Sequence, residues 1–288
     1  KLSIEIWYIW SYIAFSSIKR AEKFMSIKIN YLKKITAKSS GNLVLFSNEK
    51  FSTNNLKKYL FNSEFLYIND LLKTSDLKKN LLVFEVNSKK KIILISVKKD
   101  LKSFDIENLG AKFFGYINHG KNSAYFINSD NIVEKYENFI GYFLHGLKLK
   151  SYEFKKYKTK KETKSFSINV LGNKNKPSVQ SQLKFKALEE GTFYARDLVS
   201  EPGNILHPDE YAKRLNSLRK DGLKVNIYNE KKLKKMGMNA LLGVGMGSIR
   251  GSYLVTMEWN GAKNNSKPLA FVGKGVTFDT GGYSLKPA

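Results

Sequence analysis

The side chains best suited to chemistry lie near the end of the chain, in the stretch VGKGVTFDTGGYSLKPA over residues 272–288. Lys274 lies between two glycines, and Asp279 and Lys286 follow it. The carboxylate of an aspartate is a hard oxygen donor suited to a divalent cation. A lysine beside a metal ion is disfavoured as an ammonium and can become a neutral ligand, whereas a protonated lysine can act as an electrophile. The spacing alone therefore indicates a metal or anion site over 274–286.

The glycines of this region allow other interpretations. The Gly-Lys-Gly sequence could form an ordinary turn, or it could bind phosphate, but the Walker pattern GxxxxGK[ST] is absent. Upstream, Gly243, Gly245 and Gly247 loosely resemble a dinucleotide-binding loop, but the third glycine of GxGxxG is missing. Phosphate and dinucleotide binding are therefore weaker hypotheses than a metal or anion site.

Predicted strands and helices alternate before this stretch. The apolar run 269–272 predicts a strand, and binding sites in open α/β sheets form beyond the carboxyl ends of strands. The other elements predicted here are helices over 181–200 and 207–222, a strand over 223–228, a short basic helix over 229–236, and strands over 240–244 and 253–258. Because helices and strands alternate, we expect a doubly wound α/β domain that the chain contains only in part.

The first half of the chain predicts a small α/β domain without a chemical motif. Its β-branched and aromatic runs favour strands over 43–46, 81–86 and 92–97, and its helical periodicity favours helices over 54–61, 105–117 and 131–149. His145 lies near the apolar stripe of the last helix and is interpreted as a partly buried structural histidine.

The amino-acid composition excludes several classes of protein function. A chain of 288 residues, 42% of them hydrophobic, has enough apolar material for one large domain or two ordinary ones. The absence of cysteine excludes disulfides, cysteine-ligated zinc and a cysteine nucleophile. The net charge of +25 comes almost entirely from lysine, whereas nucleic-acid surfaces recruit arginine. Compositional drift is therefore favoured over a selected polyanion-binding surface.

A composition shift divides the chain near residue 176, because every proline lies at or after Pro177. We predict an N-terminal α/β domain over 25–172, a hinge over 173–182, and the first part of a second domain over 183–288. Residues 1–24 precede the first methionine, and their apolar run is too short to span a bilayer. They are predicted to be a non-native or disordered leader.

The stretch over 272–288 closely resembles the signature of the leucyl aminopeptidase (cytosol aminopeptidase) family of dinuclear metallo-aminopeptidases. Three further segments agree in order: ARDLVSEPGN at 195–204, MGMNALLGVGMGS at 236–248 and SYLVTMEWNG at 252–261. The resemblance is continuous from about residue 141 and weak before it. It implies an enzyme that releases N-terminal amino acids from peptides, with two divalent ions (Mn, Zn or Mg) activating a bridging water.

The resemblance also implies residue roles. Lys274 would bind one ion through a neutral amine, Asp279 would bridge both ions, and Lys286 would polarise the scissile carbonyl. The family carries a further Asp after this stretch, and then an Asn-Thr-Asp-Ala-Glu-Gly-Arg element with two more carboxylate ligands and an Arg that holds a bicarbonate. These residues are absent from the 288, so we expect a truncated and inactive chain whose activity belongs to a longer parent.

The family also implies partners and a compartment. The implied partners are peptide substrates with a free N-terminus and further copies of the chain in a homo-hexamer. The implied location is the cytoplasm, without a membrane. The alternative function is a basic nucleic-acid-binding or scaffold protein with a non-catalytic peptidase-like domain, and it rests on charge alone.

Overall fold

The computed structural model describes residues 25–32, 41–119, 124–132, 136–159, 164–261 and 267–279. The described chain forms two compact units, which meet in sequence between Phe193 and Tyr194. This point lies inside helix α5 (Val179–Ser200), which begins within the segment predicted as a hinge. The limits predicted for the domains and the hinge stay predictions, and the predicted leader over 1–24 lies outside the described residues.

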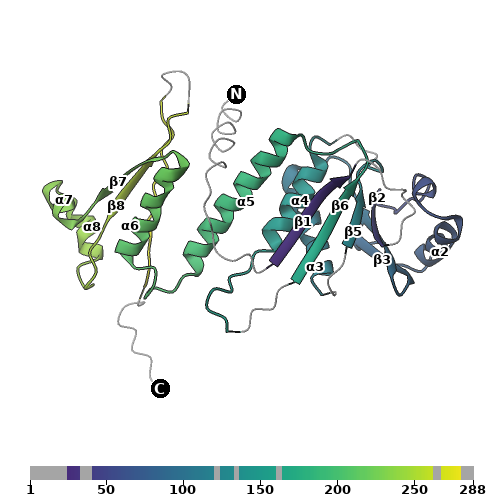
Figure 1. Cartoon of the computed structure of the whole chain (residues 1–288), viewed down its shortest axis with the longest axis horizontal. Helices are drawn as coiled ribbons and strands as arrows, with labels where there is room; N and C mark the ends of the chain where they lie inside the picture. Colours follow the sequence, from purple (N-terminus) through teal and green to yellow (C-terminus); the bar gives the residue numbers. More distant parts are fainter. Residues whose placement is uncertain are drawn as a thin grey trace. The chain divides into compact units, whose positions relative to one another are not determined.

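The first unit is built on a six-stranded sheet (Figure 1). Its strands are β1 (Met25–Leu32), β2 (Asn42–Ser47), β3 (Leu81–Asn87), β4 (Lys90–Ser96), β5 (Ala124–Asn128) and β6 (Lys164–Leu171), in the order β1-β6-β5-β2-β4-β3. All neighbouring pairs are parallel except β3 and β4, which form an antiparallel edge. A largely parallel sheet needs a helical layer on each face, because both faces are apolar.

The helices of the first unit are α2 (Asn62–Leu72), α3 (Ser103–Ile117), α4 (Phe139–Lys150) and α5 as far as Phe193, with a 3-10 turn η2 (Lys57–Tyr59) before α2. Alternate residues of β2 enter two different cores. Val44 and Phe46 pack with α3 and α4, whereas Leu43 and Leu45 pack with the segment around α2. This alternation follows from the two-residue period of a strand and makes the unit a three-layer α/β structure.

The sequence predicts several elements of this unit correctly and others wrongly. The strands over 43–46, 81–86 and 92–97 and the helix over 105–117 are confirmed. The helix predicted over 54–61 is wrong, because Phe61 is extended and the side chain of Glu64 caps a helix that begins only at Asn62. The helix predicted from 131 begins at Phe139, after Asn138 in a left-handed conformation.

Helices α3 and α4 approach each other closely through two glycines. A Cβ on Gly110 would lie 1.8 Å from the carbonyl oxygen of Phe143, and one on Gly146 would lie 1.9 Å from that of Glu107. His145 is buried at the same crossing, with its Nδ1 2.9 Å from Glu107 Oε1. It is a structural histidine, as expected from the sequence.

Asn131 replaces a strand partner at the end of β2. Strands β2 and β5 pair only through residues 42–44 and 125–127, so Phe46 lies beyond the ladder on that side. The side chain of Asn131 accepts a hydrogen bond from Phe46 N at 3.0 Å and donates one to Phe46 O. Asn131 is 3% exposed, so water cannot easily take over these bonds.

Substituting Asn131→Leu should therefore lower the free energy of unfolding by about 1–3 kcal/mol, the cost of buried polar groups left unsatisfied. Urea denaturation followed by circular dichroism measures this loss. Asn48→Leu is the matched control, because Asn48 is exposed and its side chain bonds only a local backbone N–H. Equal losses in the two variants would contradict the assignment.

The second unit contains the end of α5, α6 (Pro208–Asn216), a 3-10 turn η3 (Ser217–Asp221), β7 (Lys224–Tyr228), α7 (Glu230–Lys235), α8 (Asn239–Val244) and β8 (Leu254–Glu258). Strands β7 and β8 pair in antiparallel fashion and form the sheet of the described residues of this unit. Gly222 ends the η3 segment with φ of 90°, a conformation that favours glycine and that agrees with its predicted role as a helix stop.

Two strand predictions in this unit are wrong. Residues 240–244 belong to helix α8, because alanine and leucine are good helix formers and only Val244 is β-branched. Residues 269–272 form no strand, and Phe271 and Val272 are 88% and 99% exposed. A strand needs a hydrogen-bonded neighbour, and in the part of the chain that the structure describes this segment has none.

Candidate active site

The glycine-rich segment over 267–279 lies against two other parts of the second unit. A Cβ on Gly203 would lie 3.0 Å from the carbonyl oxygen of Thr277 and 3.2 Å from Cβ of Phe278. A Cβ on Gly275 would lie 2.7 Å from a ring carbon of Tyr211. The turn after α5 and helix α6 therefore both contact residues 275–278, and at each contact a side chain in place of glycine would force its neighbour to shift.

The residues predicted to carry the chemistry lie on or just after this segment. Lys274 and Asp279 are exposed, and they lie on either side of the contacts made by residues 275–278. A Cβ on Gly273 would meet open space, so of the two glycines beside Lys274 only Gly275 makes a close contact. Lys286 lies outside the described residues.

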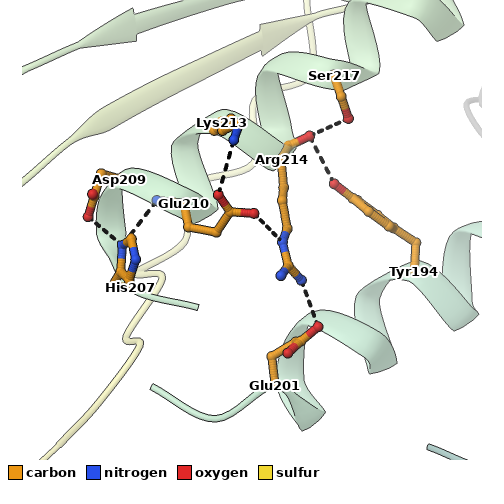
Figure 2. Close-up of polar contacts among 8 residues, drawn as sticks. All are labelled: Tyr194, Glu201, His207, Asp209, Glu210, Lys213, Arg214 and Ser217. Atoms are coloured by element: carbon orange, nitrogen blue, oxygen red, sulfur yellow. Dashed lines mark hydrogen bonds and ion pairs between the residues drawn. The ribbon is translucent and has the colours of Figure 1, made fainter. Parts of the chain in front are cut away.

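Arg214 is the centre of a polar network between helices α5 and α6 (Figure 2). Its Nη1 donates to Glu201 Oε1 at 2.9 Å, and its Nε donates to Glu210 Oε1 at 3.0 Å. The side chain of Glu201 is 2% exposed, and that of Arg214 is 23% exposed. The backbone oxygen of Arg214 accepts hydrogen bonds from Tyr194 Oη at 3.2 Å and from Ser217 Oγ at 2.6 Å. One residue of α6 thus ties the end of α5 to η3.

Charges in this network remain paired. Hydrogen bonding to Arg214 lowers the pKa of Glu210, against the effect of burial, and the charges of Lys213, Arg214 and His207 lower it further. Burial would lower the pKa of Arg214, but its hydrogen bonds to Glu201 and Glu210 raise it. Arg214 and Glu210 therefore stay ionised at neutral pH and remain an ion pair.

A second polar group lies at the beginning of α6. Nδ1 of His207 lies 2.5 Å from Asp209 Oδ1 and 3.3 Å from the backbone nitrogen of Glu210, and Arg250 Nη1 lies 3.2 Å from Asp209 Oδ2. Loss of water raises the pKa of Asp209, but a backbone hydrogen bond, the hydrogen bond of His207 and the charges of His207 and Arg250 lower it overall. These contacts cap the helix, and Pro208 with the two acidic residues after it suits the first turn.

The two donors on the glycine-rich segment are of a chemical kind that binds a divalent metal, but two are too few to form a complete site. An amine nitrogen from Lys274 and a carboxylate oxygen from Asp279 are both competent ligands. Zinc takes about four ligands and magnesium about six, so two donors form at most part of a centre. Within the described ranges, no cluster of three or more His, Asp or Glu could hold a metal ion.

No pattern in the sequence indicates the bridge between Glu201 and Arg214. The Glu210 and Arg214 pair has the i,i+4 spacing of a helical ion pair and could have been found by that signal. The contact of Glu201 with Arg214 joins two helices across a turn, and no periodicity marks it. The packing of Gly203 on Thr277 is likewise visible only in three dimensions.

Comparison with known structures places the fold. A tomato leucine aminopeptidase mutant superposes with a TM-score of 0.69 at 20% identity, covering 91% of this chain and 56% of that chain. A bottromycin maturation enzyme in complex with Mn superposes with a TM-score of 0.56 at 12% identity, covering 77% of this chain and 46% of that chain. The α/β fold class is confirmed, and it is the fold of a leucine aminopeptidase.

Comparison of sequences identifies the family. Residues 193–288 match the family described as "Cytosol aminopeptidase family, catalytic domain". Probable cytosol aminopeptidases of Brucella melitensis and Agrobacterium fabrum are 48% identical over 149 residues and 46% identical over 151 residues. Each match covers 50% of this chain, and they cover 31% and 30% of the relatives. Residues 193–288 are thus similar to the catalytic domain of the cytosol aminopeptidase family, and the resemblance found in the sequence is confirmed.

These findings do not favour the alternative of a nucleic-acid-binding or scaffold protein. The chain spans about a third of the length of its curated relatives. These matches therefore do not by themselves assign it the activity of a whole protein. Among the helices of the described residues, none has both the length and the apolar character needed to cross a bilayer.

Proposed function

We propose that this chain is part of a metal-dependent aminopeptidase that releases N-terminal amino acids from peptides. The observation that carries the proposal is the family match over 193–288, which contains Lys274, Asp279 and Lys286 within the stretch 272–288. The contacts of that segment with Gly203 and Tyr211 support it, because they give the two described donors a defined attachment to the unit.

In this proposal Lys274 and Asp279 hold metal, and the remaining ligands come from a longer parent chain. Two divalent ions (Mn, Zn or Mg) would bind the free α-amine of the substrate and lower the pKa of the attacking water. Lys274 is a ligand only as a neutral amine, because a ligating group must give up its proton. Lys286 is protonated and donates a hydrogen bond to the carbonyl oxygen of the scissile peptide as negative charge develops there.

The test uses the parent protein, which is this chain extended to the full length of its relatives. It measures hydrolysis of leucine p-nitroanilide by that protein. We expect release of p-nitroaniline that a chelator abolishes and that added Mn²⁺ or Zn²⁺ restores. The N-acetylated substrate is the control, because it lacks the free amine that the site must bind. Hydrolysis that survives the chelator, or that is equally fast on the blocked substrate, would refute the proposal.

The same parent is proposed to work in the cytoplasm as a homo-hexamer, with a bicarbonate held by an arginine beyond residue 288. Light scattering on the parent protein as it elutes from a size-exclusion column tests the hexamer directly, because the measured mass must be six times that of one chain.

A further inference from the structure

We propose that Arg214 is a positioning residue for the active site. By bridging Glu201 and Glu210, it holds the turn that contains Gly203 and helix α6 in a fixed arrangement, and both of these support residues 275–278 between the two described metal donors. The inference rests on the proposed function, and it adds a residue that touches neither substrate nor metal.

The bridge is strong enough to act in this way because it is largely shielded from water. A carboxylate that is 2% exposed, like that of Glu201, is costly unless a cation and hydrogen bonds compensate it. Arg214 supplies the cation, and its planar guanidinium uses two different nitrogens for the two carboxylates (Figure 2). A guanidinium bound on two sides has a defined orientation, which a lysine ammonium would lack.

The turn after α5 transmits the position of Glu201 to Gly203. The backbone nitrogens of Ile205 and Leu206 both donate to the carbonyl oxygen of Pro202, at 2.9 and 2.8 Å. These bonds make residues 202–206 one compact turn, and Leu206 closes it as a 5% exposed core residue. A shift of Glu201 therefore moves Gly203, whose backbone lies against Thr277.

Helix α6 supplies the other support of the same segment. Tyr211 lies three residues before Arg214, so both side chains emerge from neighbouring positions on one helical face. The ring of Tyr211 occupies the space beside Gly275. Arg214 thus joins the two elements that contact residues 275–278, and it sets the distance between them.

Loss of the Arg214 side chain should loosen this arrangement without unfolding the unit. Tyr194 and Ser217 bond to the backbone oxygen of Arg214, and a substitution leaves these bonds in place. The pairing of β7 with β8 does not involve Arg214 at all. A positioning role and a general folding role therefore predict different results.

The first test compares Arg214→Met with Lys213→Met by amide hydrogen exchange in the 288-residue chain. Lys213 is the matched control, because it lies next to Arg214 on α6 and pairs with the same Glu210 at 3.7 Å, but its side chain is 81% exposed. In Arg214→Met, the amides of Ile205 and Leu206, which donate to Pro202 O, should exchange about tenfold faster or more, the factor expected for loss of a charge-assisted hydrogen bond. Amides of β7 and β8 should not change, and Lys213→Met should behave like the unaltered chain.

The second test uses the parent protein and leucine p-nitroanilide. Arg214→Met should lower kcat by about 10- to 100-fold, as a small misplacement of catalytic groups does, and KM should change little. Its Mn²⁺ affinity should fall as well, and Arg214→Lys should recover part of both losses because it restores the cation without the fork.

Three results would overturn the inference: exchange in Arg214→Met equal to that of the unaltered chain, equal acceleration in β7 and β8, or unchanged kcat and metal affinity. Failure of the unaltered parent to hydrolyse the substrate would instead refute the proposed function. In that case the exchange experiment still decides whether Arg214 holds the turn over 202–206.

Discussion

Replacing Lys286 by alanine in the parent protein should lower kcat by about 10²–10³-fold, the range found for loss of one oxyanion donor. The reason is that Lys286 donates to the oxygen on which negative charge develops, and this interaction is stronger in the transition state than in the bound substrate. KM and metal content should therefore change little. Steady-state kinetics together with metal analysis of the purified variant measure all three quantities.

Lys274→Ala is the matched comparison, because it removes the same type of side chain from the same segment. Here the loss falls on a proposed ligand, so metal occupancy should decrease and added Mn²⁺ should restore part of the activity. The two lysines are thus assigned opposite charge states, twelve residues apart. If Lys286→Ala removes the metal while Lys274→Ala retains it, the two roles are reversed and this interpretation of the segment is wrong.

The sequence predicted best where local periodicity decides the structure. Helix α3 buries Ile106, Leu109, Phe113 and Ile117, which recur at the three- and four-residue spacing that the sequence displays. Its prediction over 105–117 needed no information from elsewhere in the chain. The stop at Gly222 was predictable for the same reason, because the left-handed conformation there is a local requirement.

Prediction failed where residues far apart in the sequence decide whether a strand or a contact forms. The run over 269–272 is apolar enough for a buried strand, but a strand exists only with a neighbour, and its own sequence cannot supply one. Strand β1 was not predicted either, and it forms by parallel pairing with β6, more than a hundred residues later. Residue types and spacing indicated the chemical residues of the glycine-rich segment and the family resemblance gave their roles, whereas their supports at Gly203, Tyr211 and Arg214 required the structure.

The largest effect on stability should come from Lys90→Met in the first unit. Lys90 Nζ lies 2.6 Å from Glu64 Oε1, and both side chains are 8% exposed. The ammonium also lies 5.3 Å from the centre of the Phe61 ring. Without Lys90, the buried carboxylate retains only the hydrogen bond from Phe61 N to its Oε2, at 3.1 Å. Removing one partner of a buried ion pair costs about 3–5 kcal/mol, because the other charge is left uncompensated.

Lys91→Met is the control, since it removes the neighbouring lysine of the same strand. Lys91 pairs with Glu85, but their side chains are 38% and 68% exposed, and an exposed pair contributes about 0–1 kcal/mol. Urea denaturation followed by circular dichroism should therefore show a much larger loss of unfolding free energy for Lys90→Met than for Lys91→Met.

A double variant separates the uncompensated charge from lost packing. Adding Glu64→Leu to Lys90→Met removes the buried carboxylate, so most of the lost stability should return. Recovery should be incomplete, because Glu64 also caps α2 through Phe61 N, and a lost cap costs about 1 kcal/mol. If the double variant is less stable than Lys90→Met alone, the destabilisation arises from packing around the lysine stem and not from the unpaired charge.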